Sequence, residues 1–161
     1  MNFEELYEQY FNDVYRYILK LSSSHHIAEE ITSDTFFKAM RSIDSFRGDC
    51  DVRVWLCQIA KNCYYSYLKK QNKINPLEDY IPDESKSVEE AVADEYDVKR
   101  IKKVLHEIDE PYKEVFMWRV FADMSFKQIA QIFGKTENWA CVTYHRAKAK
   151  IQKKLEEDNN E

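Results

Sequence analysis

The sequence predicts an all-α protein made of two small helical domains joined by an acidic linker. Only two glycines and three prolines interrupt its 161 residues, and its apolar residues recur at helical spacing without the alternation that indicates strands. Charge is distributed unevenly, because residues 75–98 carry nine acids and one lysine in a chain whose net charge is −5. We therefore place the domains at residues 1–74 and 87–161, with residues 75–86 as the acidic linker.

The N-terminal domain is predicted to contain three to four helices, and the apolar periodicity places three of them. The first covers residues 3–21, and the serines at 22–24 end it and cap a second helix at about 26–45. A loop at 46–50 follows. Asp51 then caps a third helix that runs to about Gln71.

The C-terminal domain is predicted to contain four helices. A capping box at 87–90 begins the first, which ends near Ile108, and Pro111 lies in the first turn of the second, which ends near Phe121. The last two helices cover 125–133 and about 136–156. Gly134 separates them.

These last two helices have the pattern of a helix-turn-helix. Ser125 and Gln128 form a second capping box, Gly134 allows a left-handed turn, and Thr136 caps the final helix. That helix has an inner stripe of apolar and small residues and an outer stripe that would face a DNA major groove. The inner stripe is Ala140, Tyr144, Ala147 and Ile151, and the outer one is Glu137, Asn138, Cys141, Val142, His145 and Lys148. Seven bases against one acid in 127–154 favour DNA binding over an ordinary helical hairpin.

Nothing in the sequence indicates an enzyme, a cofactor or a metal site. The four cysteines, at 50, 57, 63 and 141, form no C-x-x-C pair, and no histidine lies at zinc-finger spacing from them. No nucleophile with an adjacent base and no glycine-rich phosphate loop occurs. The N-terminus is acidic and no apolar run approaches the length of a membrane span, so we expect a cytoplasmic protein.

Several segments together resemble the extracytoplasmic-function (ECF) sigma factors of bacterial RNA polymerase. Residues 124–130 and 138–148 look like the family's C-terminal helix-turn-helix, which reads the −35 promoter element. Residues 28–39 look like the segment that binds the coiled coil of the polymerase β′ subunit. Residues 46–48, 55–62 and 67–70 resemble the segment that recognises and melts the −10 element. The resemblance covers nearly the whole chain outside the linker, in the family's order, and implies an alternative sigma factor rather than a catalyst.

The resemblance, together with residue chemistry, assigns three sets of site residues. The residues expected to bind core polymerase are Glu29, Glu30, Asp34, Phe37, Lys38 and Arg41. Those expected to contact the −10 element are Gly48, Asp49, Cys50, Asn62, Tyr65, Ser66, Lys69, Lys70 and Lys73. Those expected to contact the −35 element are Thr136, Glu137, Asn138, Cys141, Val142, His145, Arg146 and Lys148. Lysines suit phosphates, Asn62 suits a base edge and Tyr65 suits stacking on an unpaired base.

Two residues have a second interpretation. Phe37 is either an exposed anchor for a protein partner or part of the core, which we expect to contain Ile27, Ile31, Ala39, Met40 and Ile43. Trp55 is expected to be buried rather than to stack on a base. At Cys141 the family commonly has Lys or Arg, so this position departs from the pattern.

The partners implied by the resemblance are core polymerase, through its β′ coiled coil and β flap, promoter DNA and an anti-sigma factor, which in the family is often anchored in the membrane. No small-molecule substrate is expected. The acidic linker is expected to occupy the polymerase cleft and RNA exit path. Two other functions remain open from the residues alone. One is a self-standing regulator that binds a palindrome as a dimer, and the other is a helical adapter that binds only proteins.

Overall fold

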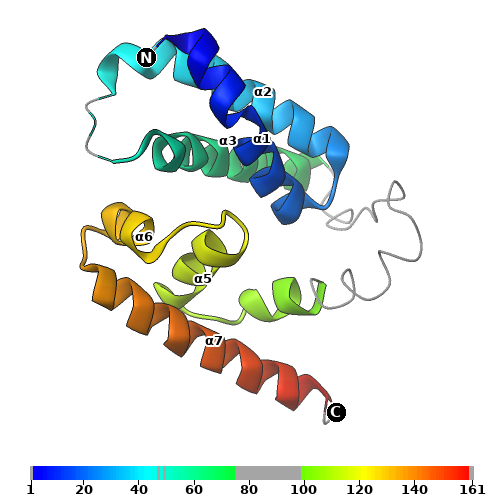
Figure 1. Cartoon of the computed structure of the whole chain (residues 1–161). Helices are drawn as coiled ribbons and strands as arrows, with labels where there is room; N and C mark the ends of the chain where they lie inside the picture. Colours follow the sequence, from blue (N-terminus) through cyan, green and yellow to red (C-terminus); the bar gives the residue numbers. More distant parts are fainter. Residues whose placement is uncertain (1, 47, 49, 75–98, 160–161) are drawn as a thin grey trace. The chain divides into compact units, whose positions relative to one another are not determined.

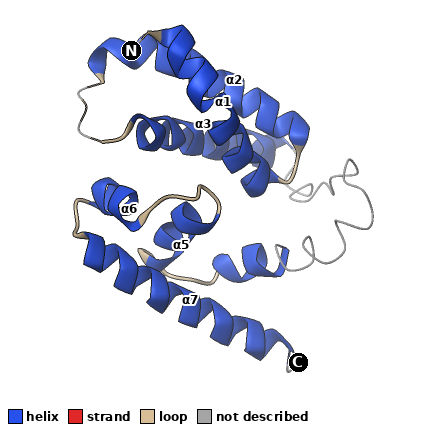
Figure 2. Cartoon of the chain, viewed as in Figure 1, coloured by secondary structure: helices blue, strands red, loops and turns tan. Residues whose placement is uncertain are grey.

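The computed structural model describes residues 2–46, 48, 50–74 and 99–159, with the backbone alone at 72–74 and 159. Within these residues the structure is helical and contains no strand (Figure 2). The chain divides into two compact units, residues 1–85 and 86–161. The predicted all-α fold with two helical units is therefore confirmed.

Unit 1 is a bundle of three long helices (Figure 1): α1 at Phe3–Ser22, α2 at His25–Ser42 and α3 at Val52–Ile74. Local chemistry sets their ends. Asn2 and Glu5 form a capping box at the start of α1, and Ser23 ends the helix in the left-handed region with φ of 57°. The Ser24 hydroxyl then accepts the amide hydrogen of Ile27 and begins α2. A single turn of 3-10 helix, η1 at Ile43–Ser45, follows α2.

The core of unit 1 is formed by one face of each of the three helices. Its buried residues include Leu6, Val14, Ile18, Leu21, Ile31, Phe36, Val54, Leu56, Cys57 and Ala60. Aromatic rings of α1 surround Phe36 of α2, with Tyr7 and Phe11 at centroid distances of 5.2 and 6.0 Å. Two threonines of α2, Thr32 and Thr35, are also fully buried.

Unit 2 contains a helical stretch at 99–105, α5 at Tyr112–Val120, α6 at Phe126–Phe133 and α7 at Glu137–Asn159. The helices α5 and α6 both pack against α7. The core of this unit includes Val104, Val115, Phe116, Trp118, Met124, Ile129, Ala140, Ala147 and Ile151.

Most predicted helix limits agree with the structure within a few residues, and the differences have local causes. The second helix ends at Ser42, three residues early, because its last turn tightens into η1. The third helix runs to Ile74 and the last to Asn159, each about three residues beyond the predicted end. The predicted linker and most of the helix predicted from 87 lie outside the described residues, so the domain limits stay a prediction.

Candidate functional site

The outward face of α2 exposes all six residues that were predicted to bind a protein partner: Glu29, Glu30, Asp34, Phe37, Lys38 and Arg41. Phe37 is 52% exposed, and the Arg41 guanidinium carbon lies 4.5 Å from the centroid of its ring. Phe36, which precedes it in the sequence, points into the core and is 2% exposed. Phe37 is therefore not a core residue. It forms an apolar anchor beneath a cation, within a ring of charged side chains.

The predicted core of α2 was partly wrong. Ile31 and Ala39 are buried, and Ile27 and Ile43 are half-buried, but Met40 is 45% exposed. At about 100° per residue, Met40 falls just beyond the buried arc that ends at Phe36. It therefore adds apolar surface beside Phe37, and the sequence analysis had not counted it there.

A second outward face lies on α3. Asn62, Tyr65, Ser66, Lys69 and Lys70 are all exposed, and they recur at helical spacing along one side. The Tyr65 side chain is 41% exposed and is therefore available to stack on another ring. Lys73 was also predicted for this face, but the structure describes only its backbone. These five residues place an amide, an aromatic ring, a hydroxyl and two cations on one surface.

The inner side of α3 attaches this face to the bundle. Tyr64 is buried, and its hydroxyl donates to the carbonyl oxygen of Leu21 in α1 at 3.5 Å. Burial raises the pKa of Tyr64 to about 12. The apolar spacing of this helix predicts a core stripe of Leu56, Ile59, Ala60, Cys63 and Tyr67, and the structure confirms it in part, because Leu56, Ala60 and Cys63 are buried. Ile59 and Tyr67 are half-buried, whereas Val54, Cys57 and Tyr64, which were not predicted, complete the core.

The segment before α3 contains the remaining residues predicted for −10 contact. Gly48 is exposed with φ of 76°, Cys50 is half-buried, and Asp49 lies outside the described residues. Phe46 packs on Trp55 of α3 with ring centroids 4.9 Å apart. Trp55 is half-buried rather than buried as predicted.

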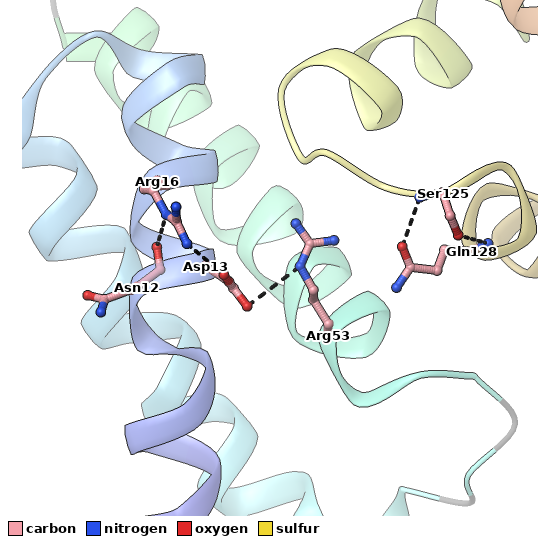
Figure 3. A network of polar contacts seen from close by, with 6 residues as sticks. All are labelled: Asn12, Asp13, Arg16, Arg53, Ser125 and Gln128. Carbon is pink, nitrogen blue, oxygen red and sulfur yellow. Dashed lines mark hydrogen bonds and ion pairs between the residues drawn. The ribbon is translucent and has the colours of Figure 1, made fainter.

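In unit 2 the turn between α6 and α7 has the predicted caps. The Ser125 amide donates to Gln128 Oε1 at 2.9 Å, and the Gln128 amide donates to Ser125 Oγ at 3.1 Å (Figure 3). Gly134 ends α6 in the left-handed region, with φ of 64°. The Trp139 amide then donates to Thr136 Oγ1 at 3.0 Å, which caps α7. The predicted helix-turn-helix is thus present.

The two predicted sides of α7 are also present. Ala140, Ala147 and Ile151 are buried, Tyr144 is half-buried, and Thr143, which the sequence analysis did not count, is buried with them. The opposite side exposes Thr136, Glu137, Asn138, Val142, His145, Arg146 and Lys148. Cys141 is half-buried at the edge of this outward surface.

A cluster formed by an arginine of α5 and an aromatic ring of α6 packs against α7, and the sequence analysis did not predict it. The Arg119 guanidinium carbon lies 4.3 Å from the Phe126 ring centroid, and its Nη1 donates to the Met124 carbonyl oxygen at 2.9 Å. Phe126 in turn contacts Tyr144 and His145 of α7, with ring centroids 5.6 and 6.4 Å apart. The i, i+7 spacing of Arg119 and Phe126 across a turn gives no periodic signal, so only the structure reveals this contact.

The described residues provide no cluster of side chains that would hold a metal ion. The four cysteines all lie in the described part of the chain and form no disulfide, and burial raises the pKa of Cys57 to about 12. None of the described helices has the length and apolar character needed to cross a membrane. The candidate site is made up of the outward faces of α2, α3 and α7.

Comparison with known proteins relates both units of the chain to one protein family. Residues 6–74 match the family model for sigma-70 region 2, and residues 99–151 match that for sigma-70 region 4. The chain is 24% identical to the RNA polymerase sigma factor YlaC of Bacillus subtilis, covering 98% of this chain and 94% of the relative. It is 26% identical to the ECF RNA polymerase sigma factor SigM of the same organism, covering 94% of each.

A solved structure has the same fold. The sigma factor RpoE of Bartonella quintana, solved in complex with the anti-sigma factor NepR, aligns over 96% of both chains with a TM-score of 0.60 and 23% identity.

Proposed function

The chain belongs to the sigma-70 family as an alternative sigma factor of the ECF type, which directs transcription initiation, and from this premise we propose how its units share that work. Unit 1 binds core polymerase through α2 and the −10 element through α3. Unit 2 binds the −35 element through α7. The chain catalyses no reaction, and its role is to select the start site for polymerase.

The exposed anchor on α2 carries the proposal for unit 1. Phe37 has half of its surface in contact with solvent, although the rest of unit 1 buries Phe36 beside it. An exposed aromatic ring surrounded by charged side chains has the composition of an interface anchor with a polar rim. We assign Glu29, Glu30, Asp34, Lys38 and Arg41 to the polar rim of that contact, with the β′ coiled coil as the partner.

The outward face of α3 suits a strand whose bases are unpaired. Lys69 and Lys70 neutralise phosphates, while Tyr65 stacks on a base and Asn62 binds a base edge. Melting needs this combination, because a base that has left the duplex must be held out of it. We assign Gly48, Asp49, Cys50, Ser66 and Lys73 to the same interaction.

The capped turn and outward face of α7 support the role of unit 2. A recognition helix reads base edges in the major groove with residues near its N-terminal end. Asn138, Val142 and His145 occupy those positions and are exposed. We assign Thr136 and Lys148 to the phosphates, Glu137, Cys141 and Arg146 to neighbouring base edges, and the β flap to this unit as its polymerase contact.

We also propose an anti-sigma factor as a partner in the cytoplasm, either soluble or anchored to the membrane. The likeness to RpoE of Bartonella quintana, which was solved with such a partner, supports this proposal. Coprecipitation from membrane and soluble fractions of the native host tests it. Failure to recover a stoichiometric inhibitor of transcription from either fraction would contradict it.

Gel shifts with and without a bacterial core polymerase test the proposed function directly. A randomised promoter library is incubated with the free chain and with the reconstituted holoenzyme. We expect the holoenzyme to select sequences with two spaced elements, and the free chain to select none, because small basic faces gain affinity by acting together. Selection of a palindrome by the free chain would indicate a dimeric regulator, and no selection in either sample would indicate a protein-binding adapter.

A further inference from the structure

The carboxylate of Asp13 in α1 faces two arginines. Its Oδ1 lies 3.0 Å from Arg16 Nη2, and its Oδ2 lies 3.7 Å from Arg53 Nε (Figure 3). Arg16 belongs to the same helix, and its side chain is 68% exposed. Arg53 belongs to α3, and its side chain is only 20% exposed. Of the two contacts, the one to Arg53 therefore joins separate helices and is the less screened by solvent.

The position of Arg53 explains why a carboxylate is needed there. Arg53 is the second residue of α3, and the first turn of this helix contains no acidic residue. Backbone amides give the start of a helix a partial positive charge, so a cation is disfavoured at that place. Asp51 directly precedes the helix, and Asp13 adds a second negative charge from α1 that faces Arg53 and attaches the start of α3 to its neighbour.

Two further contacts hold the same helix. Tyr64, three turns farther along α3, donates to the Leu21 carbonyl oxygen of α1. Phe46, which precedes the segment proposed to hold a −10 base, packs on Trp55. Cys57, one turn after Arg53, is fully buried between these attachments. The outward face with Asn62 and Tyr65 is carried by the same rigid helix.

We propose that Asp13 and Arg53 are positioning residues for promoter opening. Polymerase holds unit 1 through α2, whereas the opened strand is captured on α3. Any force that the DNA exerts on α3 must therefore be resisted by the attachment of α3 to the α1–α2 pair. The Asp13–Arg53 ion pair is an attachment close to the start of α3. This inference rests on the proposed function.

The experiment uses full-length variants assembled with core polymerase on a duplex promoter that the wild-type holoenzyme has selected. The variants are Asp13→Asn, Arg53→Gln, the double variant and Arg53→Lys, with Arg16→Gln as the matched control. Thymine reactivity to permanganate measures the rate of opening, and fluorescence anisotropy measures the affinity for core polymerase. A premelted version of the same promoter separates opening from later steps.

We expect opening to slow by about three- to five-fold in Asp13→Asn and in Arg53→Gln, the range of a partly exposed ion pair. The double variant should be no slower than either single variant, because both remove one interaction. Arg53→Lys should recover most of the rate, and Arg16→Gln should match wild type. The affinity for core polymerase should stay unchanged, and the premelted promoter should restore both single variants.

Three results would overturn the inference. The first is a wild-type rate of opening in both single variants. The second is a double variant whose rate falls by the product of the two single losses. The third is a loss of affinity for core polymerase as large as the loss in opening rate, which would mean that the pair only maintains the fold. Failure of the proposed function is distinguishable, because wild-type holoenzyme would then select and open no promoter.

Discussion

The thiol of Cys141 lies at the edge of the outward face of α7, at the position where the resemblance led us to expect Lys or Arg. It is half-buried, while its neighbours Asn138, Val142 and His145 are exposed. A thiol is short and lacks the two-pronged donor with which Arg binds guanine. Base preference should therefore rest on the neighbouring side chains, and an apolar contact of Cys141 with a thymine methyl is compatible with its partial burial.

We expect Cys141→Arg to tighten promoter binding and to shift the preference at one −35 base pair towards guanine. The new bidentate contact should be worth about 1–3 kcal/mol of discrimination. Selection from a −35 library by both holoenzymes measures the shift. Lys148→Ala is the control, because the loss of a phosphate contact should weaken all sequences about equally. Unchanged affinity and preference in Cys141→Arg would show that position 141 does not face DNA.

The two buried threonines of α2 allow a second test, in which a single hydroxyl group is replaced by a methyl group. Among the described residues, Thr32 Oγ1 is buried with no hydrogen-bond partner, whereas Thr35 Oγ1 donates to the Ile31 carbonyl oxygen at 2.7 Å. We expect Thr32→Val to be neutral or to stabilise the protein, because it removes an unpaired hydroxyl. Thr35→Val should lower the free energy of unfolding by about 0.5–1.5 kcal/mol.

Urea unfolding of the two variants, followed by circular dichroism, measures this difference. Equal losses of stability would show that the Thr32 hydroxyl has a partner in solution. Because both side chains are fully buried and undergo the same change in shape, each variant serves as the control for the other.

At the scale of elements, helix ends were predictable because they depend on nearest neighbours in the chain. The capping box needs only the four residues from Ser125 to Gln128, and the left-handed turn needs only the glycine at 134. Both features occur as predicted. The division between core and surface was less predictable, because it depends on how far a neighbouring helix extends. Met40 has the right spacing for the core, but it falls outside the arc that packing covers.

The candidate site shows the same limit. The outward face of α7 was predicted from spacing, because a solvent-facing stripe is periodic, and those of α2 and α3 from the resemblance together with residue chemistry. The contacts of Arg119 with Phe126 and of Asp13 with Arg53 were not predicted. Each contact joins two different helices, and helical periodicity describes neighbours within one helix only. The two residues of each contact come together only when the helices pack.

The turn of the helix-turn-helix provides the test at this scale. A Cβ at Gly134 would meet no atom within 4 Å, so the cost of Gly134→Ala is the backbone strain at φ of 64° alone. We expect a loss of about 1–2 kcal/mol in the stability of unit 2, and a smaller loss in Gly134→Asn.

The opposite change is available at Ser23, which already has φ of 57° at the end of α1. Ser23→Gly should relieve strain and stabilise unit 1 by up to about 1 kcal/mol. Thermal unfolding of the full chain measures both effects. A neutral Gly134→Ala would mean that the turn adopts another conformation.

For the whole molecule, the proposed roles separate holding polymerase from opening DNA. Phe37 and Tyr65 are both exposed aromatic residues of unit 1, but they lie on different helices. We expect Phe37→Ala to weaken the complex with core polymerase by about 1–2 kcal/mol, as the loss of an interface anchor does. Asp34→Ala should weaken the same complex.

Tyr65→Ala, and likewise Asn62→Ala, should instead leave polymerase affinity intact and reduce open complexes by about ten-fold, since stacking on a base is typically worth about 1–3 kcal/mol. Anisotropy with core polymerase and permanganate footprints measure the two quantities on the same samples, so each aromatic variant is the control for the other. Identical effects of Phe37→Ala and Tyr65→Ala on both quantities would refute the division.

The two sides of α7 also have a practical consequence for genetic engineering. Ala140, Ala147 and Ile151 hold this helix in place, and none of them belongs to the set exposed on its opposite side. Combinations at Asn138 and Val142 can therefore be randomised without touching the residues that stabilise the fold. A panel selected in this way would yield parallel gene switches, which share one polymerase inside a cell while each activates its own set of promoters.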